Sequence, residues 1–142
     1  MPIRKSSAIW EGGLKDGKGK MRLGGGGFEG SYTFSSRFEE GSGSNPEELI
    51  AAAHAGCFSM QLAGNLARAG YPPKRIATSA QVTIEKTGEG FGITRIDLFT
   101  EVSAPGIDKK VFDEQAEAAK KNCPVSKALS AVPVTLQTEL IA

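Results

Sequence analysis

A long helix signal between Asn45 and Gly70 constrains the fold of this sequence more than any other feature. Asn45 is a favoured N-cap residue, Pro46 suits the first helical position, and the two glutamates that follow complement the positive end of the helix dipole. We expect the helix to run to Ala69 and to end at Gly70, ahead of a Pro-Pro pair. Because no charged residue occurs from Leu49 to Ala67, the helix must be buried on several sides.

This helix is too apolar to be covered by one small sheet. Its apolar residues fall on two sides, and its many Ala and Gly residues would let a second helix approach closely. We therefore expect a homodimer in which a second copy covers the remaining face. One side carries Leu49, Ala53, Met60 and Ala63, and the other carries Ile50, Phe58, Leu62 and Leu66.

The segments on either side of the helix have strand patterns. Short strands at Ala8–Trp10, Gly19–Leu23 and Tyr32–Phe38 precede it, and two alternating strands joined by a turn at Gly88–Gly90 follow it. A second helix capped by Asp108 and running to about Lys121, a short third helix from Pro124 to Ser130 and a last strand from Val134 to Leu140 complete the chain. The order βββ-α-ββ-α-β with antiparallel pairings predicts an α+β fold, with antiparallel sheets packed on long central helices.

Length and charge limit the classes of protein. The 142 residues fit one domain, 1–142, with a core of its own. With a net charge of +1 and interspersed charges, the chain lacks the basic face that nucleic acid would need. No secretory signal is visible and the uncharged run is diluted by polar and small residues, so we expect neither nucleic acid nor a membrane as a partner, and a cytoplasmic location.

The two cysteines are the candidate reactive groups. In a reducing compartment, a pair of cysteines is usually inert, metal-binding or catalytic. Cys57, Cys123 and His54 are the only Cys and His residues, so a zinc site would lack its fourth ligand, and we expect neither metal nor cofactor. Cys57 lies in mid-helix, where a buried thiol is an ordinary small apolar residue unless a nearby cation lowers its pKa.

Arg37 is the candidate cation and Glu47 the carboxylate that would hold it. A bidentate pair with Glu47 would orient the guanidinium, whereas a surface pair with Glu39 or Glu40 would give Arg37 no chemical role. Glu47 and Cys57 are ten residues apart, about 15 Å along a straight helix, so they cannot touch directly. Either Arg37 spans this gap or Glu47 comes from a partner subunit, and the sequence leaves both open.

Cys123 has the more favourable local position for a thiolate. It precedes Pro124 at an expected helix start, where free backbone N–H groups stabilise negative charge. Local reasoning therefore ranks Cys123 above Cys57 as the activated thiol. The alternative is a helix-terminal cysteine without chemical importance.

Two motifs in this sequence resemble those of a known family. The stretch Asn45-Pro46-Glu47-Glu48-Leu49 through Ala53-His54-Ala55-Gly56-Cys57-Phe58-Ser59-Met60 and the stretch Asn122-Cys123-Pro124-Val125-Ser126 are similar to the two cysteine motifs of the osmotically inducible protein C and organic hydroperoxide resistance family. The likeness extends over nearly the whole chain. Its arginine pattern, Thr33-Phe34-Ser35-Ser36-Arg37-Phe38-Glu39, resembles the osmotically inducible protein C branch.

The resemblance implies an enzyme, a thiol-dependent peroxidase that reduces organic hydroperoxides to alcohols. It makes Cys57 the attacking thiol and Cys123 the resolving thiol, which reverses the local ranking. It also implies that Arg37 stabilises the thiolate and the leaving oxygen, with Glu47 as its orienting carboxylate and Glu48 as the substitute. An intertwined homodimer and recycling by an external dithiol, lipoyl-type for example, belong to the same expectation.

The resemblance also implies a catalytic cycle. The Cys57 thiolate attacks the outer peroxide oxygen and becomes a sulfenic acid, which Cys123 converts to a disulfide. Two other functions stay open: a non-enzymatic dimer that binds an apolar small molecule, and a thiol-dependent hydrolase in which His54, one turn before Cys57, is the base. Four apolar residues are candidate neighbours of a substrate tail, with core packing as the alternative: Phe38, Phe58, Met60 and Phe91.

Overall fold

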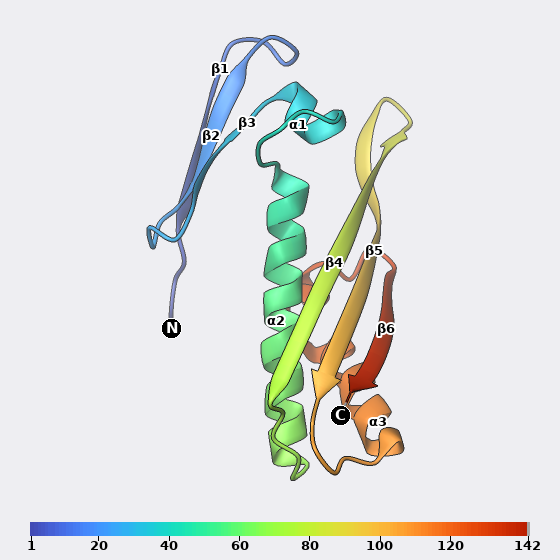
Figure 1. The fold of residues 1–142 in the computed structure, drawn as a ribbon. Coiled ribbons are helices and arrows are strands. Elements are labelled where there is room, and N and C mark those ends of the chain that lie inside the picture. The colour runs from blue at the N-terminus through green and yellow to red at the C-terminus, as the bar shows by residue number, and fades with distance from the viewer. Residues whose placement is uncertain (142) are drawn as a thin grey trace. The chain divides into compact units, whose positions relative to one another are not determined.

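The chain forms two compact units in a computed structural model that describes residues 1–141 (Figure 1). The first unit is Met1–Leu49 and the second begins at Ile50. Elements of both kinds are present, so the predicted α+β class is confirmed. That the two units act together as the single domain 1–142 stays a prediction.

The first unit is built on a three-stranded antiparallel sheet. Strands β1 (Ser6–Glu11), β2 (Lys18–Leu23) and β3 (Glu29–Tyr32) pair in sequence order, which confirms the predicted meander. The rings of Trp10 on β1 and Tyr32 on β3 lie 5.2 Å apart on either side of Gly19. A Cβ at Gly19 would come within 2.7 Å of both rings, so only glycine fits there.

The third strand, Glu29–Tyr32, lies earlier in the chain than predicted. We expected it to cover Tyr32–Phe38, but it ends at Tyr32 and is followed by the short helix α1, Phe34–Phe38. A capping box starts this helix, because Thr33 Oγ1 accepts from the Ser36 amide at 3.0 Å and Ser36 Oγ accepts from the Thr33 amide at 2.8 Å. The sequence pattern did not predict this helix start, because Ser36 occupies the position where a capping box usually has Glu or Gln.

The long helix α2 covers Pro46–Arg68, close to its predicted limits. Its start is capped as expected, since Asn45 Oδ1 accepts from the Glu48 amide at 2.8 Å. Gly70 ends it at φ +95°, with hydrogen bonds from Gly70 N to Ala67 O and from Tyr71 N to Leu66 O. These two bonds form a Schellman motif, which needs the left-handed conformation that glycine adopts without strain.

The second unit contains a three-stranded sheet, with α2 running alongside strands β4 and β5 (Figure 1). Strands β4 (Arg75–Thr87) and β5 (Gly90–Ser103) form the predicted antiparallel hairpin, and Gly88 turns the chain at φ +58°. Helix α3 (Lys109–Asn122) follows Asp108, whose side chain makes no capping hydrogen bond although we expected one. Helix α4 (Pro124–Ala128) and strand β6 (Val134–Ile141) end the described chain.

The pairing of the last strand corrects our expectation of wholly antiparallel pairings. Strand β6 pairs with β5 in parallel, because the helical segment between them returns the chain to the same end of the sheet. Thr135 lies opposite Asp97 and donates a 2.5 Å hydrogen bond to its carboxylate. This bond and the ion pair with Arg95 lower the pKa of Asp97, so a charged hydrogen bond helps to hold the register.

One apolar core joins α2, α3 and the second sheet. It contains residues of three elements, all at most 1% exposed: Phe58, Leu62 and Leu66 of α2, Ile96, Leu98 and Val102 of β5, and Phe112, Ala116 and Ala119 of α3. Only one side of α2 contributes to it, as the sequence predicted, whereas Met60 remains 79% exposed.

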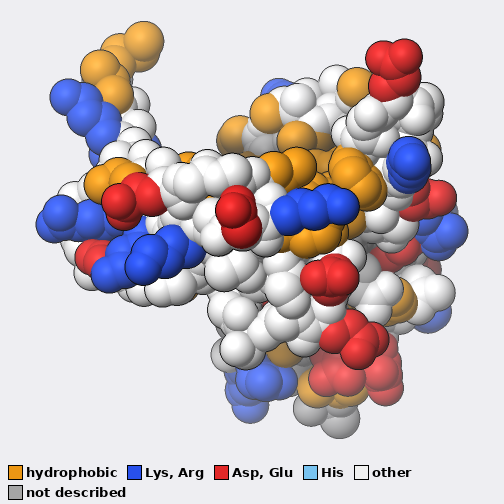
Figure 2. All heavy atoms as spheres, turned by 90° about the horizontal axis from the view of Figure 1, so that it is seen from above, with side chains coloured by type: hydrophobic (Ala, Val, Ile, Leu, Met, Phe, Trp, Pro, Cys, Tyr) orange, Lys and Arg blue, Asp and Glu red, His pale blue; other side chains and the backbone are white. Residues whose placement is uncertain are grey.

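The molecular surface is mixed in charge. On the face drawn in Figure 2, acidic and basic side chains are interspersed, as expected for a net charge of +1. Hydrophobic side chains also reach this face. Within residues 1–141, the helices are too short or too polar for any of them to span a membrane.

Candidate active site

The two cysteines meet in the second unit. Cys57 comes from the middle of α2, and Cys123 lies between α3 and α4. Both are free thiols, and their sulfur atoms are hydrogen-bonded to each other. Cys57 is partly exposed, whereas Cys123 is 0% exposed. One thiol is therefore open to a reactant, and the other is held beside it out of contact with solvent.

Helix α4 is built to stabilise negative charge on Cys123. Cys123 is the N-cap of this helix, and its sulfur accepts from the Ser126 amide at 3.4 Å. Burial acts to raise the pKa of Cys123, but hydrogen bonds from Cys57, from the Ser126 hydroxyl and from the backbone outweigh it and lower the pKa. Burial, together with the hydrogen bond to Cys123, raises the pKa of Cys57. This agrees with the local ranking from sequence, in which Cys123 is the more acidic thiol.

His54 is bonded to Ser126, the residue that also bonds Cys123, rather than to Cys57. Its Nε2 lies 2.7 Å from Ser126 Oγ, and the side chain is 0% exposed. The other ring nitrogen, Nδ1, has no hydrogen-bond partner among residues 1–141. Burial lowers the pKa of His54, so the ring is neutral at neutral pH. The Cys57–His54 pair that a thiol hydrolase would need is not formed.

The first unit contains the predicted Arg37–Glu47 pair. Arg37 Nη2 lies 2.9 Å from Glu47 Oε1, and Nε lies 3.2 Å from both carboxylate oxygens. The Glu47 side chain is 9% exposed and that of Arg37 is 36% exposed. Glu48, the substitute carboxylate, is exposed. A bidentate contact with a buried carboxylate holds the guanidinium in one orientation while leaving part of it accessible.

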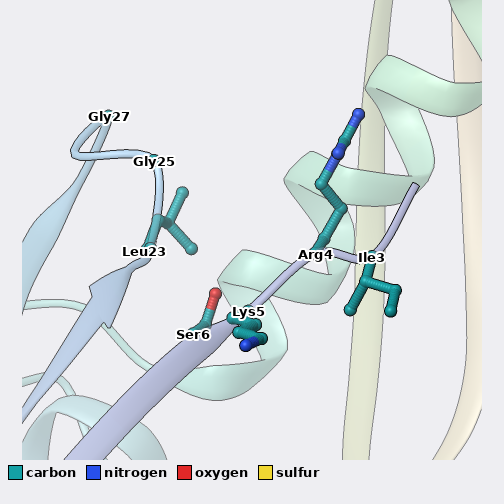
Figure 3. Close-up of a pocket in the computed structure, with 8 residues that line it drawn as sticks. Ile3, Arg4, Lys5, Ser6, Leu23, Gly25 and Gly27 are labelled. Atoms are coloured by element: carbon teal, nitrogen blue, oxygen red, sulfur yellow. The ribbon is translucent and has the colours of Figure 1, made fainter.

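A small cavity of about 180 Å³ lies beside Arg37 within the first unit. Its lining is largely aromatic, and Arg37 is the one charged residue in it: Trp10, Leu14, Tyr32, Thr33, Phe34, Arg37 and Phe38. A larger hollow of about 670 Å³ lies between the segment Ile3–Ser6 and the glycine turn after Leu23 (Figure 3). That hollow is lined by no thiol, histidine or carboxylate, so it offers none of the expected redox groups.

The four apolar residues proposed near a substrate differ in their surroundings. Phe58 is fully buried in the core, which rules out contact with a substrate tail. Met60 and Phe91 are exposed, at 79% and 53%. Phe38 lines the small cavity, and its ring lies 4.9 Å from the Arg37 guanidinium carbon. Phe38 is thus the candidate that the structure places beside an expected site residue.

Comparison with known proteins identifies the family. Residues 39–138 match the family described as OsmC-like protein. The chain is 47% identical over 138 residues to peroxiredoxin OsmC of Escherichia coli, covering 96% of each chain. This chain belongs to the OsmC-like family. It is also 33% identical over 89 residues to an organic hydroperoxide resistance protein of Xanthomonas axonopodis pv. citri, covering 62% of this chain and 61% of that protein.

Solved structures of the family share the fold. An OsmC-like protein of Mycoplasma pneumoniae is 14% identical, covers 99% of both chains and superposes with a TM-score of 0.77. The organic hydroperoxide resistance protein OhrB of Bacillus subtilis is 24% identical, covers 96% of this chain and 98% of that chain, and gives a TM-score of 0.68. The predicted OsmC-like fold is thereby confirmed.

Sequence reasoning did not assign a role to Ser126. It was quoted only as part of the second cysteine motif, yet it bonds both Cys123 and His54. Its position three residues after the N-cap is the spacing at which side chains and amides cap a helix, and this signal could have identified it. Within residues 1–141 no His, Cys, Asp and Glu side chains group so as to hold a metal ion.

Proposed function

We propose that this chain is a two-cysteine peroxidase that reduces organic hydroperoxides to alcohols. The observation that carries the proposal is the hydrogen-bonded pair of free thiols, one partly exposed and one buried. Membership of the family supports it, because a relative with 47% identity over 96% of the chain is named a peroxiredoxin. A pair of adjacent thiols can store the two oxidising equivalents of one peroxide as a disulfide.

In the proposed cycle, Cys57 is the attacking thiol because it is the accessible one. Its thiolate attacks the outer peroxide oxygen, the O–O bond breaks, and the alkoxide leaves and takes up a proton. Cys123 then attacks the resulting sulfenic sulfur, which forms the disulfide and releases water. An external dithiol, of which a lipoyl group is one example, reduces the disulfide by exchange.

Arg37 has a specific task in this proposal. Without a cation, negative charge is favoured on Cys123 rather than on Cys57. A guanidinium beside Cys57 would reverse this order and would stabilise the charge that develops on the leaving oxygen. The Glu47 carboxylate holds the guanidinium ready for this role.

The aromatic cavity beside Arg37 suggests why the substrate would be an organic hydroperoxide. Its volume of about 180 Å³ and its lining of Trp10, Phe34 and Phe38 suit a small apolar tail. An alkyl or aryl group in this cavity would place a peroxide near the guanidinium. Hydrogen peroxide has no apolar group to bind there.

We also propose that the active form is an intertwined homodimer. The exposed residues of α2 in the second unit include Ala52, Ala53, Gly56, Met60 and Ala67, which are small or apolar. Two such faces can pack closely against each other, and a second copy of this chain has the same face to offer. Because the proposed cycle needs a reducing thiol pool, we place the protein in the cytoplasm.

The deciding experiment combines intact mass with a free-thiol count. The reduced protein is treated with one equivalent of cumene hydroperoxide, and we expect both thiols and two protons to be lost, with full recovery by a dithiol. Cys57→Ser should abolish the reaction. Cys123→Ser should consume one equivalent and stop at the sulfenic acid, which only a second equivalent of peroxide would carry on to the sulfinic acid. An unchanged mass with two free thiols would reject the peroxidase and favour the dimer that binds an apolar small molecule.

A further inference from the structure

A buried histidine that the proposed cycle does not use lies at the end of a continuous series of polar contacts. His54 Nε2 is 2.7 Å from Ser126 Oγ, the Ser126 hydroxyl bonds the Cys123 sulfur, and that sulfur bonds Cys57. The first three members of the series are each at most 7% exposed. Because these three members are buried, their hydrogen bonds fix where each proton lies.

The unpartnered nitrogen of His54 indicates the direction of these bonds. A neutral ring carries its proton on Nδ1 or on Nε2. Within residues 1–141 Nδ1 has no acceptor, and a buried N–H without an acceptor is rarer and costlier than a lone pair without a donor. The proton is therefore favoured on Nε2, which donates to Ser126 Oγ. The Ser126 hydroxyl hydrogen is then directed to the Cys123 sulfur.

We propose that His54 is a positioning residue that directs the Ser126 hydroxyl onto Cys123 and so keeps the resolving thiol deprotonated for disulfide formation. This inference rests on the proposed function, in which Cys123 resolves the Cys57 sulfenic acid. The Ser126 amide and hydroxyl together supply two donors to one sulfur. Two donors stabilise the thiolate over the thiol, because a thiol sulfur is only a weak acceptor.

The step that this arrangement serves is balanced as follows. The Cys123 thiolate attacks the sulfenic sulfur of Cys57, the S–S bond forms and the S–O bond breaks. Cys57 sulfur is reduced and Cys123 sulfur is oxidised by the same electron pair. The departing hydroxide takes up the proton that Cys123 had released, and water leaves. His54 does not touch the reacting atoms, and it stays neutral throughout.

The alternative is that His54 only fills the core. A purely structural histidine would make its contacts without any effect on Cys123. The two roles differ in what a substitution does: loss of packing lowers stability, whereas loss of the positioned hydroxyl changes the ionisation of one thiol and one step of the cycle. The test therefore follows the two steps separately.

The first experiment measures the two steps in a single turnover. Peroxide consumption reports attack by Cys57, and the loss of the second thiol reports disulfide formation. With Ser126→Ala we expect peroxide consumption within about twofold of wild type and disulfide formation slowed by roughly tenfold, since one charge-assisted hydrogen bond is lost. His54→Leu should act in the same way, and His54→Gln, which retains an N–H donor, should restore most of the rate.

Ser59→Ala is the matched control on α2. The Ser59 hydroxyl bonds Ala55 O and Thr78 Oγ1, both at 2.8 Å, and neither bond leads to a thiol. We expect both steps to keep their wild-type rates in this variant. Disulfide formation at the wild-type rate in Ser126→Ala would overturn the proposal. Equal slowing by His54→Leu and His54→Gln would overturn the role of His54.

A second readout does not depend on peroxidase activity. In a Cys57→Ser background, the ultraviolet absorbance of the thiolate is followed against pH, and Cys123 is the single thiol. We expect Ser126→Ala and His54→Leu to raise the pKa of Cys123, and His54→Gln to leave it low. If wild type forms no disulfide with peroxide, the proposed function fails, yet this titration still decides whether His54 and Ser126 stabilise the thiolate. Identical titration curves in all variants would overturn that role.

Discussion

The Arg37 side chain is 36% exposed while its carboxylate partner Glu47 is nearly buried, and this asymmetry suits a cation that acts on a further group. Glu47 is 9% exposed and makes three contacts with Arg37, between 2.9 and 3.2 Å. A buried carboxylate with one cationic partner cannot exchange it for water at low cost. In the proposed cycle, the exposed part of the Arg37 side chain binds the peroxide or the thiolate.

Substitutions at this pair test the proposed role of Arg37. Arg37→Met should lower kcat/KM for cumene hydroperoxide by about a hundredfold, because the leaving oxygen loses its donor. Glu47→Gln should lower the same kcat/KM by roughly tenfold, since the guanidinium remains but loses its orientation. Steady-state assays with an excess of dithiol measure both values. Glu48→Gln is the control, because Glu48 is exposed, and an effect of the same size there would contradict the assignment to Glu47.

His54 also predicts how stability depends on pH. Burial holds its pKa below the ordinary value of 6.5, so in the window below 6.5 the unfolded chain binds a proton that the folded chain does not. The stabilising contribution is present above 6.5 and is lost as the pH falls through the window. Urea unfolding of the reduced protein at pH values on either side of 6.5 should therefore show that the free energy of unfolding falls more steeply with decreasing pH in wild type than in His54→Gln. Parallel curves would show that His54 is not buried in its neutral form.

At the scale of elements, the packing of the middle of α2 beside the start of α4 brings the two thiols together. Helix α2 carries Cys57 three residues after His54, on the side that faces α4, and α4 begins at Cys123. The two helices are connected through strands β4 and β5 and helix α3, so the thiols meet only when the second unit is packed. The apolar core of α2, α3 and β5 supplies that packing.

The C-terminal end of α2 offers a direct test of this arrangement. Gly70→Ala should destabilise the protein by about 1 kcal/mol, because alanine is strained at φ +95° and the Schellman bonds depend on that conformation. Gly25→Ala is the control, since Gly25 has no positive φ and a Cβ there meets no atom within 4 Å. Urea unfolding compares the two, and equal stabilities would mean that the motif contributes nothing.

At the scale of the whole molecule, the exposed apolar face of α2 is the feature that indicates a second subunit. Met60 is 79% exposed, and its neighbours one turn earlier and later on this face are small. A monomeric protein seldom leaves such a face open on its longest helix. The pattern suits close helix packing between two copies of the chain.

Met60→Glu should therefore weaken the dimer. A charge at the centre of a packed apolar face costs binding free energy unless it is paired. Size-exclusion chromatography with light scattering should show wild type at twice the 14.9 kDa chain mass, and the variant should shift toward the mass of a single chain. Lys110→Gln, at an exposed position on α3, changes the net charge by the same amount and should stay dimeric. Elution of wild type at the chain mass would reject the homodimer.

Local chemistry in the sequence determined much of this protein. The cap at Asn45, the stop at Gly70 and the alternation in β4 and β5 each involve residues close in sequence, so their patterns can be read directly. The same holds for the position of Cys123 at a helix start, and the cysteine motifs were enough to indicate the family. Helix α1 was not predicted, because its capping box uses two hydroxyls instead of a hydroxyl and a Glu or Gln side chain.

Contacts between distant residues were decided only by the tertiary structure. The direction of β6 depends on how the segment 104–133 crosses back over the sheet, and alternation is the same in parallel and antiparallel strands. The bond between His54 and Ser126 joins residues 72 positions apart, and it exists because the core brings α2 and α4 together. A sequence pattern names the residues that can react, whereas packing selects which of them share hydrogen bonds and hence which thiol holds the charge.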